Sequence, residues 1–345
     1  MRVRELAEWL GATFEGDGGR EVTAVTTLES AGAADVGFAA GKKAELLAEA
    51  SGAGCLLVAQ DFTNKAGRTL IRVADPRGAV ARVIQRLHPA PTHAPGVHPS
   101  ATVEEDVILG KGVSVGPGAS IGAGARVGVG TRVGPGCAIG EGVVLGERCL
   151  LHANVTVYTG VDVGNRVVLH SGCVLGADGF GFVLEAGRYQ KFPQIGRVEI
   201  GDDVEIGANT CVDRAALGVT WIGEGAKLDN MVHIGHNCRI GRHVVIAAQT
   251  GLSGGVVVED YAVIGGQVGI GDKARIESRA VLRSGCGVLT NKIVRSGQVV
   301  WGTPARPLRV HLEQLAHMAY VPELRRQVSE LKKAVERLLL KADVE

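Results

Sequence analysis

An aliphatic residue stands at every sixth position of the stretch Ile222-Gly-Glu-Gly-Ala-Lys-Leu228-Asp-Asn-Met-Val-His-Ile234-Gly-His-Asn-Cys-Arg-Ile240. The same period runs from Val103 to Leu175, returns at Ile200, and extends from Ile222 to Val300. A fixed period sustained over this length is the signature of a repeat solenoid. Each hexad supplies a short strand and a corner, and three hexads complete one triangular coil. The sequence therefore predicts a parallel β-helix.

The repeat also predicts which side chains are structural. The aliphatic residue of each hexad should point inward and stack on its equivalents in neighbouring coils. Glycine, 51 of 345 residues, often follows it, and we expect this glycine to serve the corner, where positive φ is cheap without a Cβ. Hexapeptide repeats of this kind resemble the left-handed β-helix family, an exception to the right-handed crossover rule. About ten coils at roughly 4.8 Å each would make a prism ~50 Å long.

The flanks of the repeat follow other patterns. Residues 1–97 predict a small α/β domain and a Pro-rich linker, with a helix around Leu6 and Leu10, a buried strand over Cys55–Val58 and a helix over Ala79–Leu87. Residues 98–303 form the expected β-helix domain. The fold class we expect is thus mainly β: a left-handed parallel β-helix with a small N-terminal α/β domain and C-terminal helices.

Residues 304–345 predict a helical extension. Its aliphatic side chains recur at the 4-3-4-3 spacing of a coiled-coil seam. The seam consists of Leu324, Val328, Leu331, Val335 and Leu338. Two heptads are marginal alone, so the seam favours a symmetric oligomer, and the triangular prism suggests a homotrimer.

Composition excludes several classes of protein. The net charge of +1, from 37 basic and 36 acidic side chains, argues against a nucleic-acid binder that relies on a broad positive field. The N-terminus carries Glu5 and Glu8 where a signal peptide needs an apolar run, and no stretch has the apolar length of a membrane span. The seven cysteines are scattered and never in C-x-x-C spacing, which favours reduced thiols in a cytoplasmic protein and disfavours a cysteine zinc site.

His236 is the first candidate for chemistry. It lies two places after the inward Ile234, so it should project from the prism, where an imidazole would serve as a general base. The alternative is an ordinary solvated histidine. One coil later, Gly254 should stack beside His236 and offer a backbone N–H as an oxyanion donor, or simply serve a corner. Asp229, on the preceding hexad, is a candidate partner or an ordinary corner residue.

The segment between Leu175 and Ile200 breaks the period and holds two of the six phenylalanines, Phe180 and Phe182. Loops on rigid scaffolds often carry function, although this one would also be explained by packing against its own solenoid. Histidines at 152, 170, 233 and 243 raise the alternative of a zinc site of the carbonic-anhydrase type. They lack a clear third ligand, so we expect no metal.

Four motifs together carry a specific resemblance. They are His170-Ser-Gly-x-x-x-Gly-Ala-Asp-Gly-Phe-Gly-Phe182, Pro193-Gln-Ile-Gly-Arg-Val198, Asp213-Arg214, and Asp229-Asn-x-x-x-Ile-x-His-Asn237. With them the chain resembles the UDP-3-O-acylglucosamine N-acyltransferases over nearly its whole length. The resemblance implies transfer of a 3-hydroxyacyl chain from acyl carrier protein to the 2-amine of UDP-3-O-acylglucosamine in lipid A biosynthesis. It implies no metal or redox cofactor, and a groove between the subunits of a cytoplasmic homotrimer.

The resemblance also implies roles for individual residues. His236 would take the proton of the attacking amine, Gly254 would stabilise the oxyanion, and Asp229 would orient or stabilise the imidazolium. The N-terminal domain would bind the nucleotide. The residues implied in substrate binding are Phe38, Asp178, Phe180, Phe182, Lys191, Gln194 and Asn230.

Two departures from the family pattern leave an alternative open. Gly41 and Ala44 stand where the family carries the asparagine and tyrosine that hold the uracil ring beside Phe38. A second histidine that relatives carry is absent after Ile270, where Gly271 follows directly. The alternative is a paralogous acyltransferase that acts on a different nucleotide amino sugar. From other classes, a zinc carbonic anhydrase and a purely structural solenoid also remain to be distinguished.

Overall fold

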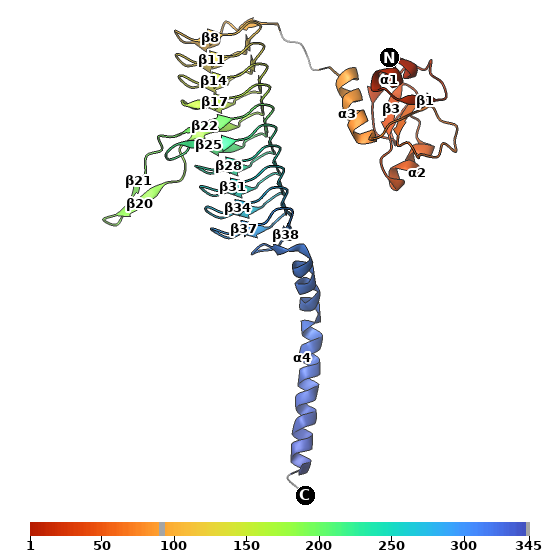
Figure 1. Cartoon of the computed structure of the whole chain (residues 1–345), viewed down its shortest axis with the longest axis vertical. Helices are drawn as coiled ribbons and strands as arrows, with labels where there is room; N and C mark the ends of the chain where they lie inside the picture. The colour runs from red at the N-terminus through yellow and green to blue at the C-terminus, as the bar shows by residue number, and fades with distance from the viewer. Residues whose placement is uncertain (90–93, 343–345) are drawn as a thin grey trace. The chain divides into compact units, whose positions relative to one another are not determined.

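The computed structural model describes residues 1–89 and 94–342, with side chains of the C-terminal helix described to residue 336. The chain forms two compact units, Met1–His93 and Ala94–Glu345 (Figure 1). Each unit has its own apolar core. The side chain of Leu338 and part of the expected Pro-rich linker, residues 90–93, lie outside the described residues.

The N-terminal unit is a small α/β domain. Its sheet has the order β1-β5-β4-β3-β2, with only β1 antiparallel to its neighbour. Its elements are α1 (Val3–Leu10), β1 (Thr13–Glu15), β2 (Ala24–Val25), β3 (Asp35–Phe38), α2 (Lys42–Ala50), β4 (Cys55–Val58), β5 (Leu70–Arg72) and α3 (Pro76–Leu87). Every residue of β4 is buried, because helices and neighbouring strands cover both faces of this central strand. The expected helices and the buried strand are confirmed.

The second unit is a β-helix whose three sides are parallel sheets of ten, ten and twelve strands over the described residues, the last of which adds one antiparallel strand (Figure 1). The first face contains β7 (Thr102–Val103), β10 (Ser120–Ile121), β13 (Ala138–Ile139), β16 (Thr156–Val157), β19 (Val174–Ala177), β24 (Cys211–Asp213), β27 (His233–Ile234), β30 (Gly251–Leu252), β33 (Gly269–Ile270) and β36 (Gly287–Val288). The second face contains β8 (Ile108–Leu109), β11 (Arg126–Val127), β14 (Val144–Leu145), β17 (Val161–Val163), β22 (Arg197–Ile200), β25 (Val219–Ile222), β28 (Arg239–Ile240), β31 (Val257–Val258), β34 (Arg275–Ile276) and β37 (Ile293–Val294). The third face contains β6 (Gly96–Val97), β9 (Ser114–Val115), β12 (Arg132–Val133), β15 (Leu150–Leu151), β18 (Val168–Leu169), β23 (Glu205–Ile206), β26 (Lys227–Leu228), β29 (Val245–Ile246), β32 (Val263–Ile264), β35 (Val281–Leu282), β38 (Val299–Trp301) and β39 (Arg306–Pro307).

The core of the solenoid confirms the six-residue period. From Val115 onward the inward aliphatic residues are at most about 5% exposed and form one continuous cluster. Five cysteines of the solenoid are buried in the same column, all as free thiols, and burial raises the pKa of Cys173 and Cys238 to about 12. A thiol with so high a pKa is an inert core residue, in agreement with the expected reduced cysteines.

The glycines that follow the inward residues are required for a different reason from the one we expected. A Cβ on Gly235, which follows an inward residue, would come within 2.7 Å of the Leu252 carbonyl oxygen, so glycine is required there by the next coil. The positive φ falls two residues later, at Asn237 in this coil and at Gly112 near the start of the solenoid. The expectation that the first glycine takes the left-handed conformation is therefore wrong.

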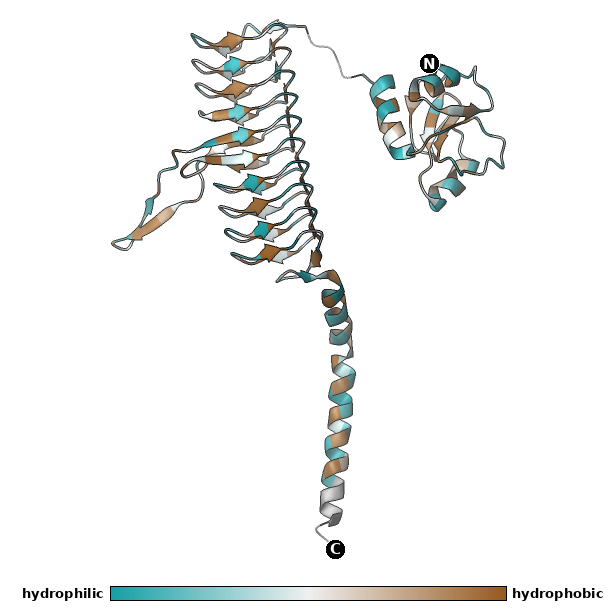
Figure 2. Cartoon of the chain, in the orientation of Figure 1, coloured by the Kyte–Doolittle hydropathy of each residue, from teal (hydrophilic) through white to brown (hydrophobic). Residues whose placement is uncertain are grey.

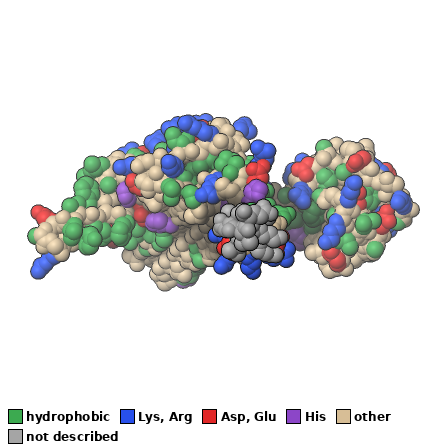
Figure 3. Space-filling model, turned by 90° about the horizontal axis from the view of Figure 1, so that it is seen from below, with side chains coloured by type: hydrophobic (Ala, Val, Ile, Leu, Met, Phe, Trp, Pro, Cys, Tyr) green, Lys and Arg blue, Asp and Glu red, His purple; other side chains and the backbone are tan. Residues whose placement is uncertain are grey.

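Two segments leave the solenoid. The hairpin β20 (Phe182–Glu185) and β21 (Arg188–Lys191) projects from the side, and all eight of its strand residues are exposed (Figure 1). Figure 3 shows hydrophobic side chains along it and charged side chains at its tip. The helix α4 (Leu308–Ala342) follows the last coil and carries the expected seam as exposed apolar positions (Figure 2).

Candidate active site

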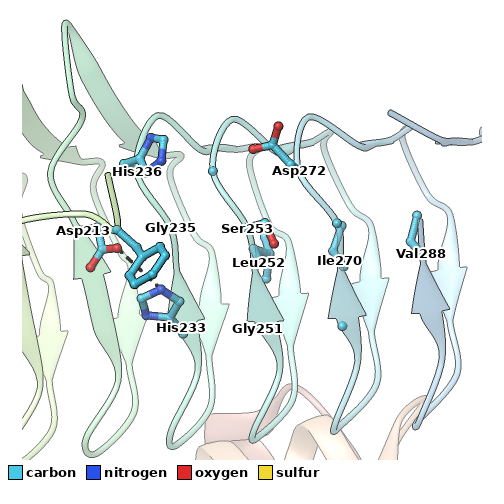
Figure 4. A pocket seen from close by; sticks show the side chains of 14 residues that line it. Asp213, His233, Gly235, His236, Gly251, Leu252, Ser253, Ile270, Asp272 and Val288 are labelled. Atoms are coloured by element: carbon cyan, nitrogen blue, oxygen red, sulfur yellow. Dashed lines mark ion pairs between the residues drawn. The ribbon is translucent and has the colours of Figure 1, made fainter. Parts of the chain in front are cut away.

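A groove of about 600 Å³ runs along the first face of the solenoid (Figure 4). Asp213 and two histidines line one end of it, and glycines with aliphatic residues and Asp272 line the other. The lining residues are Phe180, Asp213, His233, Gly235, His236, Gly251, Leu252, Ser253, Gly254, Gly269, Ile270, Gly271, Asp272 and Val288. The groove therefore brings together three of the predicted site residues: His236, Gly254 and Phe180.

His236 occupies the corner that follows β27, and Asn237 fixes its orientation. The ring Nδ1 lies 3.1 Å from the Asn237 amide oxygen. That oxygen also accepts the N–H of Ala216, while the amide nitrogen of Asn237 donates to the Leu217 carbonyl, so the amide can face only one way. Since the oxygen can only accept, Nδ1 carries the proton and Nε2 is left with a free lone pair. This tautomer is the one a general base needs.

Gly254 lies directly under the imidazole. A Cβ at this position would come within 2.5 Å of His236 Cε1 and 2.6 Å of Nε2, so only glycine leaves room for the ring. Among the described residues, no hydrogen bond is made by the Gly254 N–H. Gly254 thus combines an N–H that makes no hydrogen bond within the described residues with a place against the imidazole, and it stays a candidate oxyanion donor.

The start of the hairpin closes one side of the site. A Cβ on Gly179 would lie 2.7 Å from His236 Cβ and 3.1 Å from the Gln194 amide oxygen, so backbone passes close to both. Gln194 is 6% exposed; its Nε2 donates to the Phe192 carbonyl, but its Oε1 has no hydrogen-bond partner among the described residues. Phe180 is 85% exposed and meets Phe182 edge to face at 5.1 Å. Gln194 thus lies near the same backbone turn as His236, and Phe180 lines the groove; their part in substrate binding stays a prediction.

Asp178 and Lys191 lie at the base of the hairpin and form an ion pair with each other. Arg214 Nε lies 3.7 Å from Asp178 Oδ1, and the same guanidinium donates to the carbonyls of Gly176 and Thr159. These three charged side chains therefore tie the hairpin to the solenoid. Neither Asp178 nor Lys191 lines the groove.

Asp229 and Asn230 lie at a different corner, between the third and first faces. Asp229 accepts the backbone N–H groups of Asn230 and Ala248, and the Asn230 side chain accepts the N–H of Ala208. Both residues line a second concavity of about 620 Å³, which His236 does not reach. Within one chain, then, the expected pairing of Asp229 with His236 is not formed.

The acid that shares the groove with His236 is Asp213, which the sequence reasoning did not select. Its carboxyl is 6% exposed and lies 3.5 Å from His233 Nε2. Burial raises the pKa of Asp213, and the nearby His233 and His236 oppose that rise. The available signal was the alternation Cys211-Val-Asp213, which turns the aspartate outward next to the coil of His233.

Beyond His236 the outward positions of three successive strands are glycines. A Cβ on Gly251 or Gly269 would meet nothing within 4 Å, and neither has a positive φ, so neither local packing nor backbone conformation requires glycine there. At Gly287 the stripe ends, since a Cβ would lie 2.8 Å from Thr303 Cγ2. The missing side chains leave an open channel along the first face.

Phe38 belongs to the other unit, where it ends β3 and packs, partly buried, against the domain core. Gly41, with a φ of 92°, precedes α2, and Ala44 packs on a second cluster of the same domain. The described residues contain no cluster of histidine, cysteine or acidic side chains with metal-binding geometry. They also contain no helix long and apolar enough to cross a membrane.

Comparison with known proteins assigns the class. Models of the bacterial transferase hexapeptide repeat match residues 142–177 and 220–254, and one of the succinyl-transferase hexapeptide repeat matches residues 197–230. A solved Arabidopsis UDP-N-acetylglucosamine acyltransferase shares the fold, with a TM-score of 0.55 and 27% identity over 67% of this chain and 80% of that one. The fold and the histidine groove thus define a hexapeptide-repeat acyltransferase.

The particular family follows from closer relatives. The family model of UDP-3-O-(3-hydroxymyristoyl) glucosamine N-acyltransferase matches residues 20–86. A UDP-3-O-acylglucosamine N-acyltransferase of Pseudomonas fluorescens is 44% identical over 97% of this chain and 95% of its own length. One of Anaeromyxobacter dehalogenans is 38% identical over 97% and 96%. The chain belongs to the UDP-3-O-acylglucosamine N-acyltransferase family.

Proposed function

We propose that the protein moves a 3-hydroxyacyl chain from acyl carrier protein to the 2-amine of UDP-3-O-acylglucosamine, a step of lipid A biosynthesis, as a cytoplasmic homotrimer. The observation that supports this proposal is that one groove holds His236, whose Nδ1 faces Asn237, and Gly254, whose N–H makes no hydrogen bond within the described residues and which lies against the imidazole. A base beside an oxyanion donor is what acyl transfer to an amine requires. The proposal involves no metal or redox cofactor.

The reaction follows from this geometry. The acceptor nitrogen attacks the thioester carbonyl carbon while His236 Nε2 takes a proton from that nitrogen. The Gly254 N–H donates to the oxyanion of the tetrahedral intermediate. The carbon–sulfur bond then breaks, and the imidazolium returns its proton to the leaving thiolate. The products are an amide and the free thiol of the carrier protein, and His236 regains its starting tautomer.

The glycine channel supports an acyl chain as one of the ligands. Strands in successive coils are about 4.8 Å apart, so the channel from Gly251 to Gly287 spans roughly 10 Å beyond the base. The side chains that line it beyond His236 are mostly absent or aliphatic, although the inward Ile270 and Val288 are nearly buried and Asp272 lies at its edge. An extended hydrocarbon chain fits such a surface because burial removes apolar area from water.

The homotrimer is supported by two features of the single chain. The groove is open on one side, and α4 exposes an apolar seam that a second and third helix would cover. Because Asp229 and His236 lie at different corners of one chain, Asp229 would join the site only from a neighbouring subunit. The groove between subunits would then also hold donor and acceptor close together, which accounts for much of the rate.

The expected nucleotide site in the N-terminal unit departs from the family pattern at two positions. Gly41 offers no side-chain amide and Ala44 no aromatic ring, so Phe38 alone remains of the expected uracil site. The second candidate function is therefore the same acyl transfer to a different nucleotide amino sugar. The observation that favours this second candidate is the pair of residues Gly41 and Ala44 in the N-terminal unit.

The test is thiol release from 3-hydroxyacyl carrier protein with UDP-3-O-acylglucosamine, for wild type and His236→Ala. We expect turnover that depends on the acceptor and falls by about 10²-fold or more in the variant. The matched control is His243→Ala, because His243 stacks on Tyr261 and does not line the groove. An inactive wild type that turns over another nucleotide amino sugar would favour the second candidate, and equal rates for wild type and His236→Ala would remove His236 from the mechanism.

A further inference from the structure

Asp213 is a buried carboxylate without a hydrogen bond. It is 6% exposed, and the described residues donate no hydrogen bond to either of its oxygens. Its one polar contact is His233 Nε2 at 3.5 Å, too long for a hydrogen bond of normal strength. A carboxylate with so little access to water and no hydrogen-bond donor is costly to leave without a partner.

Two other aspartates of the solenoid, Asp202 and Asp260, do accept hydrogen bonds. Asp202 accepts the backbone N–H of Asn165 at 2.8 Å, and Asp260 accepts that of Arg242 at 2.8 Å. These residues bridge one coil to the next and so have a structural purpose. Asp213 makes no such bridge, so stability of the coil does not explain it. Its oxygens instead border the groove (Figure 4).

The surroundings of Asp213 indicate the kind of group that would bind. Phe180, from the segment that precedes the hairpin, lines the same groove as Asp213 and His233. A hydroxyl group can donate to the carboxylate and also accept from the imidazole, whereas an ammonium group can only donate. A phosphate would be repelled by the carboxylate, and a hydrocarbon chain would leave it unpaired. The site therefore suits a hydroxyl on a compact ligand.

The position along the solenoid indicates which substrate carries that hydroxyl. Asp213 lies one coil before His236, and the open glycine channel begins one coil after it. The two ends of the groove thus differ in chemistry: one carries Asp213, His233 and Phe180, and the other is lined by glycines and aliphatic residues, with Asp272 as its one acid among the described lining residues. If the acyl chain takes the apolar end, the acceptor sugar takes the end with Asp213. With its 2-amine, 3-oxygen and anomeric oxygen occupied, this sugar has free hydroxyls at carbons 4 and 6.

We propose that Asp213, with His233, binds a free hydroxyl of the acceptor sugar and positions its amine at His236. This inference rests on the proposed function. Asp213 is then a positioning residue that selects among amino sugars. Removing a partner from a hydrogen bond to a charged group lowers binding by roughly 10- to 100-fold.

The experiment compares wild type and Asp213→Asn on UDP-3-O-acylglucosamine and on its 4-deoxy and 6-deoxy analogues. For wild type we expect kcat/KM to fall by roughly 10- to 100-fold with one of the two analogues. For Asp213→Asn we expect a similar fall with the full acceptor, expressed mainly in the KM of the acceptor, and no further fall with that same analogue. The KM of the acyl carrier protein should not change.

The controls separate this role from a structural one. Asp162→Asn removes an outward acid from β17 on the second face, outside the groove, and should behave as wild type. The inference is overturned if Asp213→Asn keeps the wild-type KM for the acceptor. It is also overturned if each deoxy analogue lowers kcat/KM for Asp213→Asn by the same factor as for wild type, because the hydroxyl and the carboxylate would then act independently. If the wild-type enzyme does not turn over UDP-3-O-acylglucosamine, the result would contradict the proposed function and not this inference. A melting curve for each variant excludes misfolding, and for a poorly folded Asp213→Asn the same comparison is made with His233→Gln.

Discussion

At the scale of single residues, the site depends on what each hexad position permits. His236 and Gly254 occupy the same corner position in successive coils, so the large side chain of one covers the empty position of the other. Asn237, at the positive-φ position of that corner, holds the imidazole through its amide. The proposed general base is therefore oriented by the repeat itself, because each of its neighbours is fixed by the coil above or below.

This arrangement predicts a severe effect for Gly254→Ala. The added Cβ would come within 2.6 Å of His236 Nε2, so the imidazole has to move away from the position beside the free N–H. We expect kcat/KM to fall by about 10²- to 10³-fold, as for the loss of an oxyanion-hole donor, with little change in melting temperature. Gly266→Ala is the control, since its Cβ would meet only the Ala248 carbonyl oxygen at 3.2 Å. A fully active Gly254→Ala enzyme would contradict the placement of the base.

At the scale of elements, the first face differs from the other two by its run of outward glycines. On the second face the corresponding strands carry Arg239, Val257 and Arg275, and on the third face they carry Val245 and Val263. Within the described residues, only the first face has consecutive strands with glycine at the outward position and no other atoms of the chain in the space that a side chain would fill. The channel is a property of the sheet and of no single residue.

Gly269→Leu should therefore shorten the acyl chains that the enzyme accepts. The leucine side chain would enter the channel without a clash, because a Cβ there meets nothing within 4 Å. We expect kcat/KM for long-chain donors to fall by roughly 10-fold or more, while short-chain donors keep most of their activity. The measurement is a donor series of increasing chain length, with Val257→Leu on the second face as the control. A uniform loss across the series would argue that the chain lies elsewhere.

The hexad period also explains which parts of the site sequence reasoning reaches. Residues one coil apart stack, so the neighbours His236 and Gly254 follow from counting eighteen residues. Asp229 is only seven residues from His236, but one hexad turns the chain onto the next face and separates them. Counting eighteen residues does not find Asp213, because the coil between it and His233 is longer. Cys211 pairs with His233 at a separation of 22 residues. That Gln194 Oε1 has no partner within the described residues, and that Asp213 has only the long contact with His233, depends on packing, which no period encodes.

At the scale of the whole molecule, α4 exposes an apolar surface that a soluble chain normally covers. Seam residues Leu324, Val328 and Leu331 are 54%, 52% and 66% exposed, and their 4-3 spacing suits knobs-into-holes packing with other helices. The exposed hairpin β20–β21 also needs a packing partner, because a two-stranded hairpin alone is only marginally stable in water. Both features agree with subunits that pack around a common axis.

Leu331→Asp should weaken this association, because three carboxylates would meet at one level of the seam. We expect wild type to sediment as a trimer and the variant to dissociate at concentrations where wild type does not. Ser329→Asp, which adds the same charge outside the seam, is the control. If Asp229 of a neighbouring subunit completes the site, acyl transfer by Leu331→Asp should fall as the trimer dissociates on dilution. A dissociated variant with full activity would instead mean that one chain holds the complete site, and Asp229 would then have no part in the reaction.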